Sequence, residues 1–259
     1  CLVGSEMCIR DRFKAVKTYA DRIKKHDCIA LAELVHCGKE KVPFNDQQEA
    51  IGPVDCVNSA GVPVRAMTKD DMDRIANDFA VAAVYMQKAG FDGILVHGGH
   101  GFIFTQYLSP LMNTRTDEYG GSLENRAKFP LECIRAIRAN MPEGMPLLMR
   151  IDAHDDYLEG GLTIEEVIKF CKLAQEAGVD VLDVSRGNIL SNGLKFEVPP
   201  VDLPQGFNVD NAAKIREATG MLTIGVGRIN TPELAEKILE EDKVDMGYGT
   251  CAACRSRIL

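Results

Sequence analysis

The sequence lacks long apolar runs, an excess of basic residues and an even number of cysteines, and each absence excludes a class of protein. No apolar run approaches the length of a membrane span, and no hydrophobic signal segment opens the chain. The net charge of -8 repels a phosphate backbone, so a nucleic-acid partner is not expected. The nine scattered cysteines are typical of free thiols in a reducing compartment rather than of a disulfide framework. We therefore predict a cytoplasmic protein.

Short apolar runs alternate with amphipathic segments along most of the chain. The runs are near-continuous, which predicts parallel strands buried on both faces. They cover residues 28–35, 93–96, 146–151, 179–184, 222–226 and 244–246. Helix starts are marked by Thr68 before Asp71, by Thr163 with Glu166, and by Thr231 before Pro232. This alternation indicates an α/β fold, either a doubly wound sheet or a (β/α)₈ barrel, and six strands are two fewer than a closed barrel needs.

Three segments fall outside this rhythm. Residues 38–67 are rich in Pro, Gly, Asn and Asp, and predict a long loop over the top of a barrel. Residues 1–12 show no helical or strand period and resemble a translated sequencing adapter, so we interpret them as a non-native leader. We interpret residues 250–259 as a frameshifted tail, which resequencing the source DNA would test. The redox-like spacing of Cys251 and Cys254 is discounted because it lies in that tail.

Polar and glycine residues collect at the ends of five consecutive apolar runs. In a barrel these positions lie at the carboxyl ends of the strands, where active sites form, so their convergence predicts a site. The residues concerned are His36, His97, His100, Arg150, Asp152, His154, Ser185, Arg186, Gly187, Gly225, Gly227 and Arg228.

The pair His97 and His100 has three interpretations from spacing alone. The two imidazoles could share a metal completed by Asp152 or His154, although no Glu stands beside the first histidine as in the usual catalytic zinc motif. They could be histidines satisfied by backbone carbonyls. They could also be two donors aimed at a substrate oxygen.

The segment from Gly225 to Arg228 precedes a helix that begins at Thr231 and Pro232. Glycines let the backbone approach an anion closely, and a helix start adds N–H groups and a positive dipole end. The segment is therefore a candidate phosphate cradle, and its alternative is a tight turn.

Residues 91–129, FDGILVHGGHGFIFTQYLSPLMNTRTDEYGGSLENRAKF, resemble the long motif of the Old Yellow Enzyme-like NADH:flavin oxidoreductases. The weaker segments ELVHCGK, LLMRID, GVDVLDVSRG and LTIGVGRINTPELAEKIL extend the resemblance from Phe13 to Met246. The branch with 2,4-dienoyl-CoA reductases and bile-acid enoate reductases is the most similar. Within the motif, Asn113, Arg115, Asp117, Tyr119, Asn125 and Arg126 are interpreted as a polar lock that holds the loop after the histidines.

The resemblance implies that residues 13–249 form an FMN-binding (β/α)₈ TIM barrel, incomplete because its first two strands are missing and its last βα unit is damaged. It implies ping-pong hydride transfer from NAD(P)H through FMN to an activated alkene, a small-molecule substrate. His97 and His100 match the pair that binds the substrate carbonyl, where donors stabilise developing negative charge. Arg150 matches the arginine beside the flavin, whose charge stabilises the reduced ring.

The FMN phosphate site is implied in two halves. Gly227, with Arg228 beside it, matches the first half. Gly249 corresponds to the second, where Thr250 follows instead of the family's arginine. In the branch that the chain resembles, a 4Fe-4S cluster and FAD can follow in a C-terminal region. The sequence leaves open whether such a region followed here, which alkene is reduced, whether NADH or NADPH is used, and whether the protein is a homo-oligomer.

Two residues depart from the family pattern. Phe102 stands where a tyrosine proton donor is common, and phenylalanine has no proton to donate. Tyr157 is a speculative substitute. Glu33 replaces a flavin-contacting glutamine, and its charge would oppose flavin reduction. Two other functions stay open: a metal-dependent barrel hydrolase or lyase using His97, His100 and Asp152, and an inactive fragment of the flavoenzyme.

Overall fold

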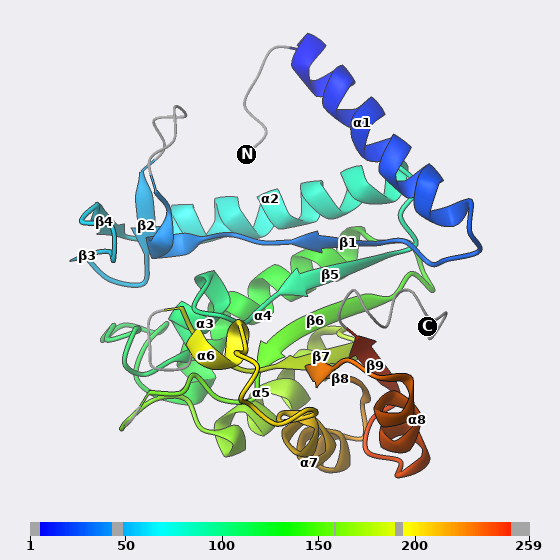
Figure 1. The fold of residues 1–259 in the computed structure, drawn as a ribbon. Helices are drawn as coiled ribbons and strands as arrows, with labels where there is room; N and C mark the ends of the chain where they lie inside the picture. The colour runs from blue at the N-terminus through cyan, green and yellow to red at the C-terminus, as the bar shows by residue number, and fades with distance from the viewer. Residues whose placement is uncertain (1–5, 43–48, 158, 190–193, 250–259) are drawn as a thin grey trace.

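The computed structural model describes residues 6–42, 49–157, 159–189 and 194–249, with side chains described from Arg12 to Gly247 within those ranges. Six parallel strands form its main sheet in the order β1-β5-β6-β7-β8-β9 (Figure 1). Their bounds are Leu31–Leu34, Gly93–His97, Leu147–Asp152, Val181–Ser185, Leu222–Ile229 and Met246–Gly249. All six predicted strands are confirmed, although β1, β7 and β9 begin two or three residues later than their apolar runs.

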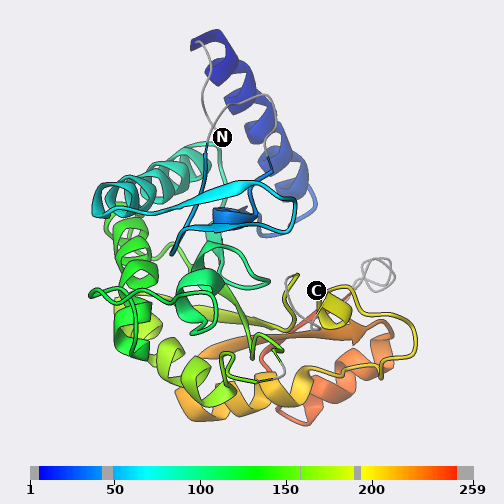
Figure 2. The ribbon, with the colours of Figure 1, turned by 90° about the vertical axis from the view of Figure 1, so that its left-hand side faces the viewer.

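Helices cover one face of this sheet. Figure 2 shows α2, α4, α5, α7 and α8 following one another along the outer side of the curved strands. The helices are α1 (Glu6–Lys24), α2 (Lys69–Lys88), α3 (Ile103–Leu108), α4 (Leu123–Asn140), α5 (Ile164–Ala177), α6 (Leu194–Glu197), α7 (Val209–Thr219) and α8 (Pro232–Glu240). This is the arrangement of a (β/α) barrel. Among the described strands β1 and β9 do not pair with each other, so the sheet seen here is an open arc.

The predicted helix starts are confirmed by their hydrogen bonds. Thr68 and Thr163 each form a reciprocal capping box, with Asp71 and Glu166 respectively. The Thr231 side chain accepts from the Leu234 N–H, and Pro232 opens α8. These bonds satisfy backbone donors that have no partner within the helix, which is why the local sequence places the starts so well.

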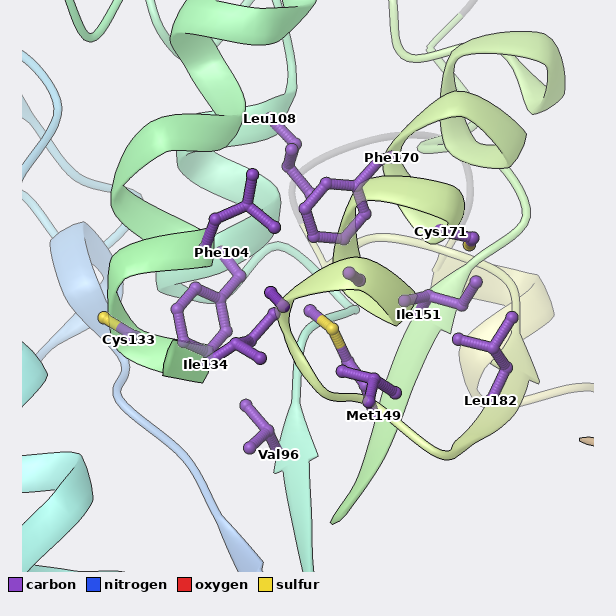
Figure 3. Packing of buried hydrophobic residues seen from close by; sticks show 14 of the residues in the cluster. Val96, Phe104, Leu108, Cys133, Ile134, Met149, Ile151, Phe170, Cys171 and Leu182 are labelled. Atoms are coloured by element: carbon purple, nitrogen blue, oxygen red, sulfur yellow. The ribbon is translucent and has the colours of Figure 1, made fainter. Parts of the chain in front are cut away.

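The core lies between the sheet and the helices. Figure 3 shows Val96, Met149, Ile151 and Leu182 of β5, β6 and β7 packed with residues of α4 and α5. Three phenylalanines extend this core toward α2, since Phe104 stacks on Phe79 at 5.3 Å and lies 6.2 Å from Phe129. Because strands β5 and β7 are buried at every position, they read as continuous apolar runs.

The loop after the histidines is held by the predicted polar lock. The Asn113 amide donates to the carbonyl oxygens of Tyr107 and Tyr119, both at 2.8 Å. The Arg126 guanidinium, 5% exposed as a residue, donates to the carbonyls of Leu108 and Gly121. These charged and amide groups replace the backbone partners that an irregular buried loop would lack.

The prediction of a structureless loop over residues 38–67 is wrong. A three-stranded sheet, in the order β2-β4-β3, forms there from Ala50–Gly52, Cys56–Val57 and Pro63–Ala66, after the short helix η1 (Gly38–Glu40). The Asn58 side chain ties it together with bonds to the backbone of Lys39, Lys41, Ala60 and Val62. Strands of two to four residues are too short to carry a readable period. The predicted position is correct, since the segment follows the carboxyl end of β1 (Figure 1).

Helix α1 begins at Glu6, so residues 6–12 are helical although no helical period was expected there. The helix is anchored further along, where Ala20 is fully buried and the Phe13 ring meets Tyr85 edge-on at 5.2 Å. An anchored helix can extend through good helix formers such as Glu, Met and Arg without burying a further face. The interpretation of residues 1–12 as a leader stays a prediction.

Residues 1–5 and 250–259, which include Cys251 and Cys254, lie outside the described part of the chain. None of the described helices is long and apolar enough to cross a bilayer.

Candidate active site

An ionic cluster lies on the sheet face opposite the helices, near the carboxyl ends of β1, β6 and β7. The Arg150 Nη1 lies 2.8 Å from Glu33 Oε1, and its Nε and Nη2 lie 2.9 and 2.7 Å from Asp183 Oδ2. We call Glu33, Arg150 and Asp183 the Arg150 cluster. Arg150 pairs in register with Asp183 on β7 and with His97 on β5, so the strand register itself brings these side chains together.

Burial sets the ionisation of the cluster. It raises the pKa of both Glu33 and Asp183, while the Arg150 charge opposes that shift at each carboxyl group. The Asp183 side chain is 3% exposed and that of Glu33 is 37% exposed. Glu33, whose charge is expected from the sequence to oppose flavin reduction, is paired directly with Arg150 in the structure.

The two predicted histidines lie in a turn that wraps around Asp152. The Gly98 N–H donates to the Arg150 carbonyl at 2.7 Å, and the His100 N–H donates to Asp152 Oδ2 at 2.5 Å. A Cβ on Gly99 would lie 2.7 Å from Asp152 Oδ1, so only glycine fits there. His100 takes the left-handed φ of 61°, a strained conformation of the kind that accumulates at functional sites.

The imidazoles of His97 and His100 meet inside this turn. His100 Nδ1 lies 3.3 Å from His97 Nε2, and His100 Nε2 lies 2.7 Å from the Ser185 hydroxyl. Burial, with a smaller contribution from the nearby Arg150 charge, lowers the pKa of His97 to about 4. Burial, followed by His97 and Arg150, lowers the pKa of His100 to about 3. Both rings are therefore neutral near pH 7, with one N–H donor each.

Two further side chains border the histidines. The Phe102 ring meets His97 edge-on, with centroids 5.0 Å apart. Glu197 of α6 places Oε1 3.9 Å from His100 Nδ1. Tyr157, the speculative substitute donor, lines a cavity of about 530 Å³ together with His154, Lys195 and Phe196.

Sequence reasoning missed Asp183 and Glu197. Asp183 left a signal, because an ionisable residue in the middle of a buried apolar strand needs a partner. Glu197 left none, because it precedes no strand end and belongs to no recognised motif. Asp152 was predicted to lie among the strand-end site residues, with a metal ligand as its one suggested role, and in the structure it accepts the His100 N–H.

The metal interpretation gains no support from the geometry. His97, His100 and Asp152 do come together. Within the ranges that the structure describes, however, no group of three His, Cys, Asp or Glu side chains is arranged to hold an ion.

The candidate phosphate segment is a bulged part of β8. Gly227 has a φ of 130°, and a Cβ there would lie 3.1 Å from Asn208. Glycine is thus favoured there by close packing against the start of α7, and the phosphate-cradle and tight-turn interpretations both stay predictions. Arg228 has a left-handed φ of 55° and forms no ion pair with any described residue. The register pairs Ile229 with Gly249, so β9 brings Gly249 beside this segment.

Comparison with known proteins agrees with this arrangement. The profile of the NADH:flavin oxidoreductase / NADH oxidase family matches residues 8–249. The chain is 37% identical over 229 residues to the NADH oxidase of Thermoanaerobacter brockii, covering 87% of this chain and 35% of that protein. It is also 37% identical over 236 residues to the NADPH dehydrogenase of Bacillus cytotoxicus, covering 86% and 61% respectively.

Solved structures give the same result. A 2-naphthoyl-CoA reductase in complex with 2-naphthoyl-CoA matches with a TM-score of 0.83 at 26% identity, over 92% of this chain and 38% of that one. An Old Yellow Enzyme homologue from Zymomonas mobilis matches in fold, with a TM-score of 0.72 at 21% identity, over 92% and 67%.

The chain thus has the α/β-barrel fold of Old Yellow Enzyme homologues. The chain belongs to the NADH:flavin oxidoreductase / NADH oxidase family. It spans from about a third to less than two thirds of the length of the two curated relatives named above. Membership of the 2,4-dienoyl-CoA reductase branch stays a prediction.

Proposed function

We propose that the protein is an FMN-dependent oxidoreductase that transfers hydride from NAD(P)H to an activated alkene, such as an enone or an enoyl thioester. The observation that carries the proposal is the buried, neutral pair His97 and His100, fixed by a glycine turn beside Arg150. Two neutral donors next to a fixed cation suit a reaction in which negative charge develops on a carbonyl oxygen.

The described residues fit FMN. The Asp183 Oδ1 is buried without a hydrogen-bond partner among them, although its Oδ2 is doubly bound by Arg150, so the cluster has an acceptor to spare for a ring N–H. Arg150 would bind the ring and Arg228, with the Gly227 and Gly249 backbone, would bind the phosphate. When bound, FMN accepts hydride from NAD(P)H and passes it to the β-carbon of the alkene.

The histidines would hold the substrate oxygen. Their facing nitrogens lie 3.3 Å apart, close enough for one oxygen to accept from both. If the Ser185 hydroxyl donates to His100 Nε2, the ring keeps its own proton on Nδ1, the nitrogen that faces His97. Asp152 holds the turn through the His100 backbone N–H, so both donors are fixed before substrate arrives.

Absorption spectroscopy of the purified chain supplied with FMN tests the cofactor assignment. We expect a bound-flavin spectrum that survives gel filtration, and Arg228→Ala to weaken FMN more than riboflavin, which has no phosphate. A colourless protein would contradict flavin binding by this chain and favour the inactive-fragment alternative. Iron analysis of the parent protein tests the further proposal that a 4Fe-4S cluster and FAD follow the barrel, as in the 2,4-dienoyl-CoA reductase branch.

Rapid kinetics of the two half-reactions tests the substrate class. His97→Ala should leave flavin reduction by NADPH intact and slow reoxidation by 2-cyclohexenone by about 100-fold, the usual effect of removing one such donor. Reoxidation by ferricyanide, which develops no oxyanion, should not change. His26→Ala is the matched control because His26 is exposed. Equal losses with both acceptors would refute the oxygen-binding role.

A further inference from the structure

A site that reduces an alkene needs a proton as well as a hydride. The hydride bonds to the β-carbon, and the α-carbon must then receive a proton from an acid within reach. Phe102 cannot supply it, and its ring packs edge-on against His97. The inference below rests on the proposed function and asks which side chain carries that proton.

Most acidic side chains around the histidines form hydrogen bonds or ion pairs with other groups. Asp152 has a side chain only 2% exposed and lies under the glycine turn, where it accepts the His100 N–H. Glu33 and Asp183 are bound by Arg150 within the Arg150 cluster. Tyr157 lines the cavity beside His154. Asp152 and Asp183 each keep one buried oxygen without a described hydrogen-bond partner, and Asp152 Oδ1 lies 3.6 Å from His100 Nε2, the nitrogen that contacts Ser185 rather than His97.

Glu197 differs from Asp152 in which nitrogen of His100 it approaches. Its Oε1 lies 3.9 Å from His100 Nδ1, the nitrogen that faces His97. Its Oε2 is buried and has no hydrogen-bond partner in the described residues. The carboxyl group therefore borders the space between the two histidines, where the substrate oxygen would bind. The α-carbon of the substrate is bonded to the carbonyl carbon and would lie next to this space.

The short helix α6 that carries Glu197 is fixed over the strand ends. The Phe196 ring lies 3.8 Å beneath the Arg186 guanidinium, and Arg186 is itself bound to Asp156 at 2.8 Å. A cation held over an aromatic ring by a carboxylate is a stable contact when partly buried. Glu197 is thus positioned from the β7 side of the site, by residues that do not touch the histidines.

We propose that Glu197 is the proton donor of the reductive reaction. As hydride bonds to the β-carbon, the electron pair of the C=C bond forms a new bond between the α-carbon and the Glu197 proton. The O–H bond of Glu197 breaks and leaves a carboxylate. Its side chain is 20% exposed, so water can return the proton before the next turnover.

The surroundings of Glu197 favour its acid form. Burial raises the pKa of Glu197, and no cation is recorded in direct contact with its carboxyl group in the described structure. A neutral carboxylic acid is what a proton donor must be when the substrate binds. Charged and titratable groups surround it on four elements: His97 at the end of β5 with His100 after it, Asp152, Asp155 and Asp156 on and after β6, Arg186 after β7, and Lys195 on α6.

Infrared titration of the apo chain tests the proton-holding role without flavin. Glutamate labelled with ¹³C should show a protonated carboxyl band that persists above the pH range of solvated glutamates, and that Glu197→Gln removes and Glu165→Gln, at an exposed ion pair, does not. If Glu197 ionises at about 4.3, the value of a solvated glutamate, it cannot hold the proton and the proposal is overturned.

Half-reaction kinetics of the holoenzyme tests the transfer itself. Glu197→Gln should leave NADPH reduction and ferricyanide reoxidation unchanged, and slow reoxidation by 2-cyclohexenone at least 10-fold. In the wild type the rate of reoxidation by 2-cyclohexenone should fall at high pH, where Glu197 has lost its proton. In Glu197→Gln this fall should be absent. Phe102→Tyr in the same chain should restore the rate, which a merely structural role would not allow.

The outcomes separate the two proposals. Wild-type reoxidation by 2-cyclohexenone in Glu197→Gln, or no rescue by Phe102→Tyr, overturns the proton-donor role while leaving the proposed function intact. Failure of the wild type itself to bind FMN or to be reduced overturns the proposed function, and the infrared titration still decides whether Glu197 holds a proton.

Discussion

The two faces of the parallel sheet differ in what they bury. The helix-covered face buries apolar side chains almost completely, as Ile94, Leu147 and Leu182 show at 0% exposure. The opposite face has a small apolar patch of Leu95, Leu148, Val181 and Ile224, and carries the Arg150 cluster toward the carboxyl ends.

The difference separates stability from function within one sheet. Apolar burial is non-directional and supplies most of the stability. On the opposite face, ionisable groups are buried away from water. Their burial lowers the stability and shifts their pKa values. We therefore expect the apolar packing on the helix-covered face to supply the stability that holds the catalytic candidates on the opposite face.

Removing a core side chain from the helix-covered face should have the largest effect. Phe129 is fully buried and lies 4.5 Å from Tyr107. We expect Phe129→Ala to lower the free energy of unfolding by about 3–5 kcal/mol, because it leaves a cavity. Leu222→Ala on the opposite face, where the side chain is 53% exposed, should cost less than about 1 kcal/mol. Urea unfolding measures both, and equal losses would remove the distinction between the faces.

Breaking the Arg150 cluster should come next. Arg150→Ala leaves the buried Asp183 carboxyl without its cation, and we expect a loss of about 3 kcal/mol at pH 8. The loss should shrink toward pH 5, because a carboxyl group with a raised pKa takes up a proton and ceases to be a buried charge. Lys214→Ala at the exposed pair with Glu165 should cost less than about 1 kcal/mol at either pH. A loss that does not depend on pH would contradict this account.

The buried histidines should make the protein sensitive to acid. The pKa of His97 is about 4 when folded, below about 6.5 when unfolded, so the unfolded chain binds more protons between those values. The contribution is fully present above pH 6.5 and falls by about 3 kcal/mol as the pH drops toward 4. Denaturant unfolding across this range should show a shallower acid slope in His97→Gln, whereas His26→Gln should keep the wild-type slope. An unchanged slope in His97→Gln would show that folding does not lower the pKa of His97.

Glycine substitutions should give the smallest effect and locate the close approach at β8. Gly227 and Gly121 both have positive φ, but only at Gly227 would a Cβ meet backbone and side-chain atoms near 3.1 Å. Gly121→Ala should cost about 1 kcal/mol for the backbone conformation alone. Gly227→Ala should cost about 1 kcal/mol more, since Asn208 must shift. Thermal unfolding of the pair measures the difference, and equal shifts would mean that α7 does not pack against the strand.

Much of the fold could be predicted because its signals are local. Apolar runs indicate buried parallel strands, and threonine N-caps such as Thr68 and Thr163 mark the starts of helices. The small sheet within residues 38–67 could not be predicted, because its strands are too short for a period and depend on Asn58 reaching across a loop. The helical form of residues 6–12 was missed because it depends on an anchor further along the chain.

The candidate site was predicted only as residue types at strand ends. His97, His100 and Arg150 were identified, and the structure brings them to one edge of the sheet. The partners that set their chemistry were not identified, because they are remote in sequence. Arg150 binds Glu33 across 117 positions, and His100 contacts Ser185 across 85.

The sequence by itself determined that this protein alternates buried parallel strands with capped helices and carries the histidine motif of a flavin oxidoreductase family. Only the tertiary structure decided that burial lowers the pKa of both histidines, that Glu33 is paired with Arg150, and that Glu197 lies beside His100. The reason is physical. Local patterns fix which segments form strands and helices, whereas pKa values depend on burial and on charges that meet only after the chain has folded.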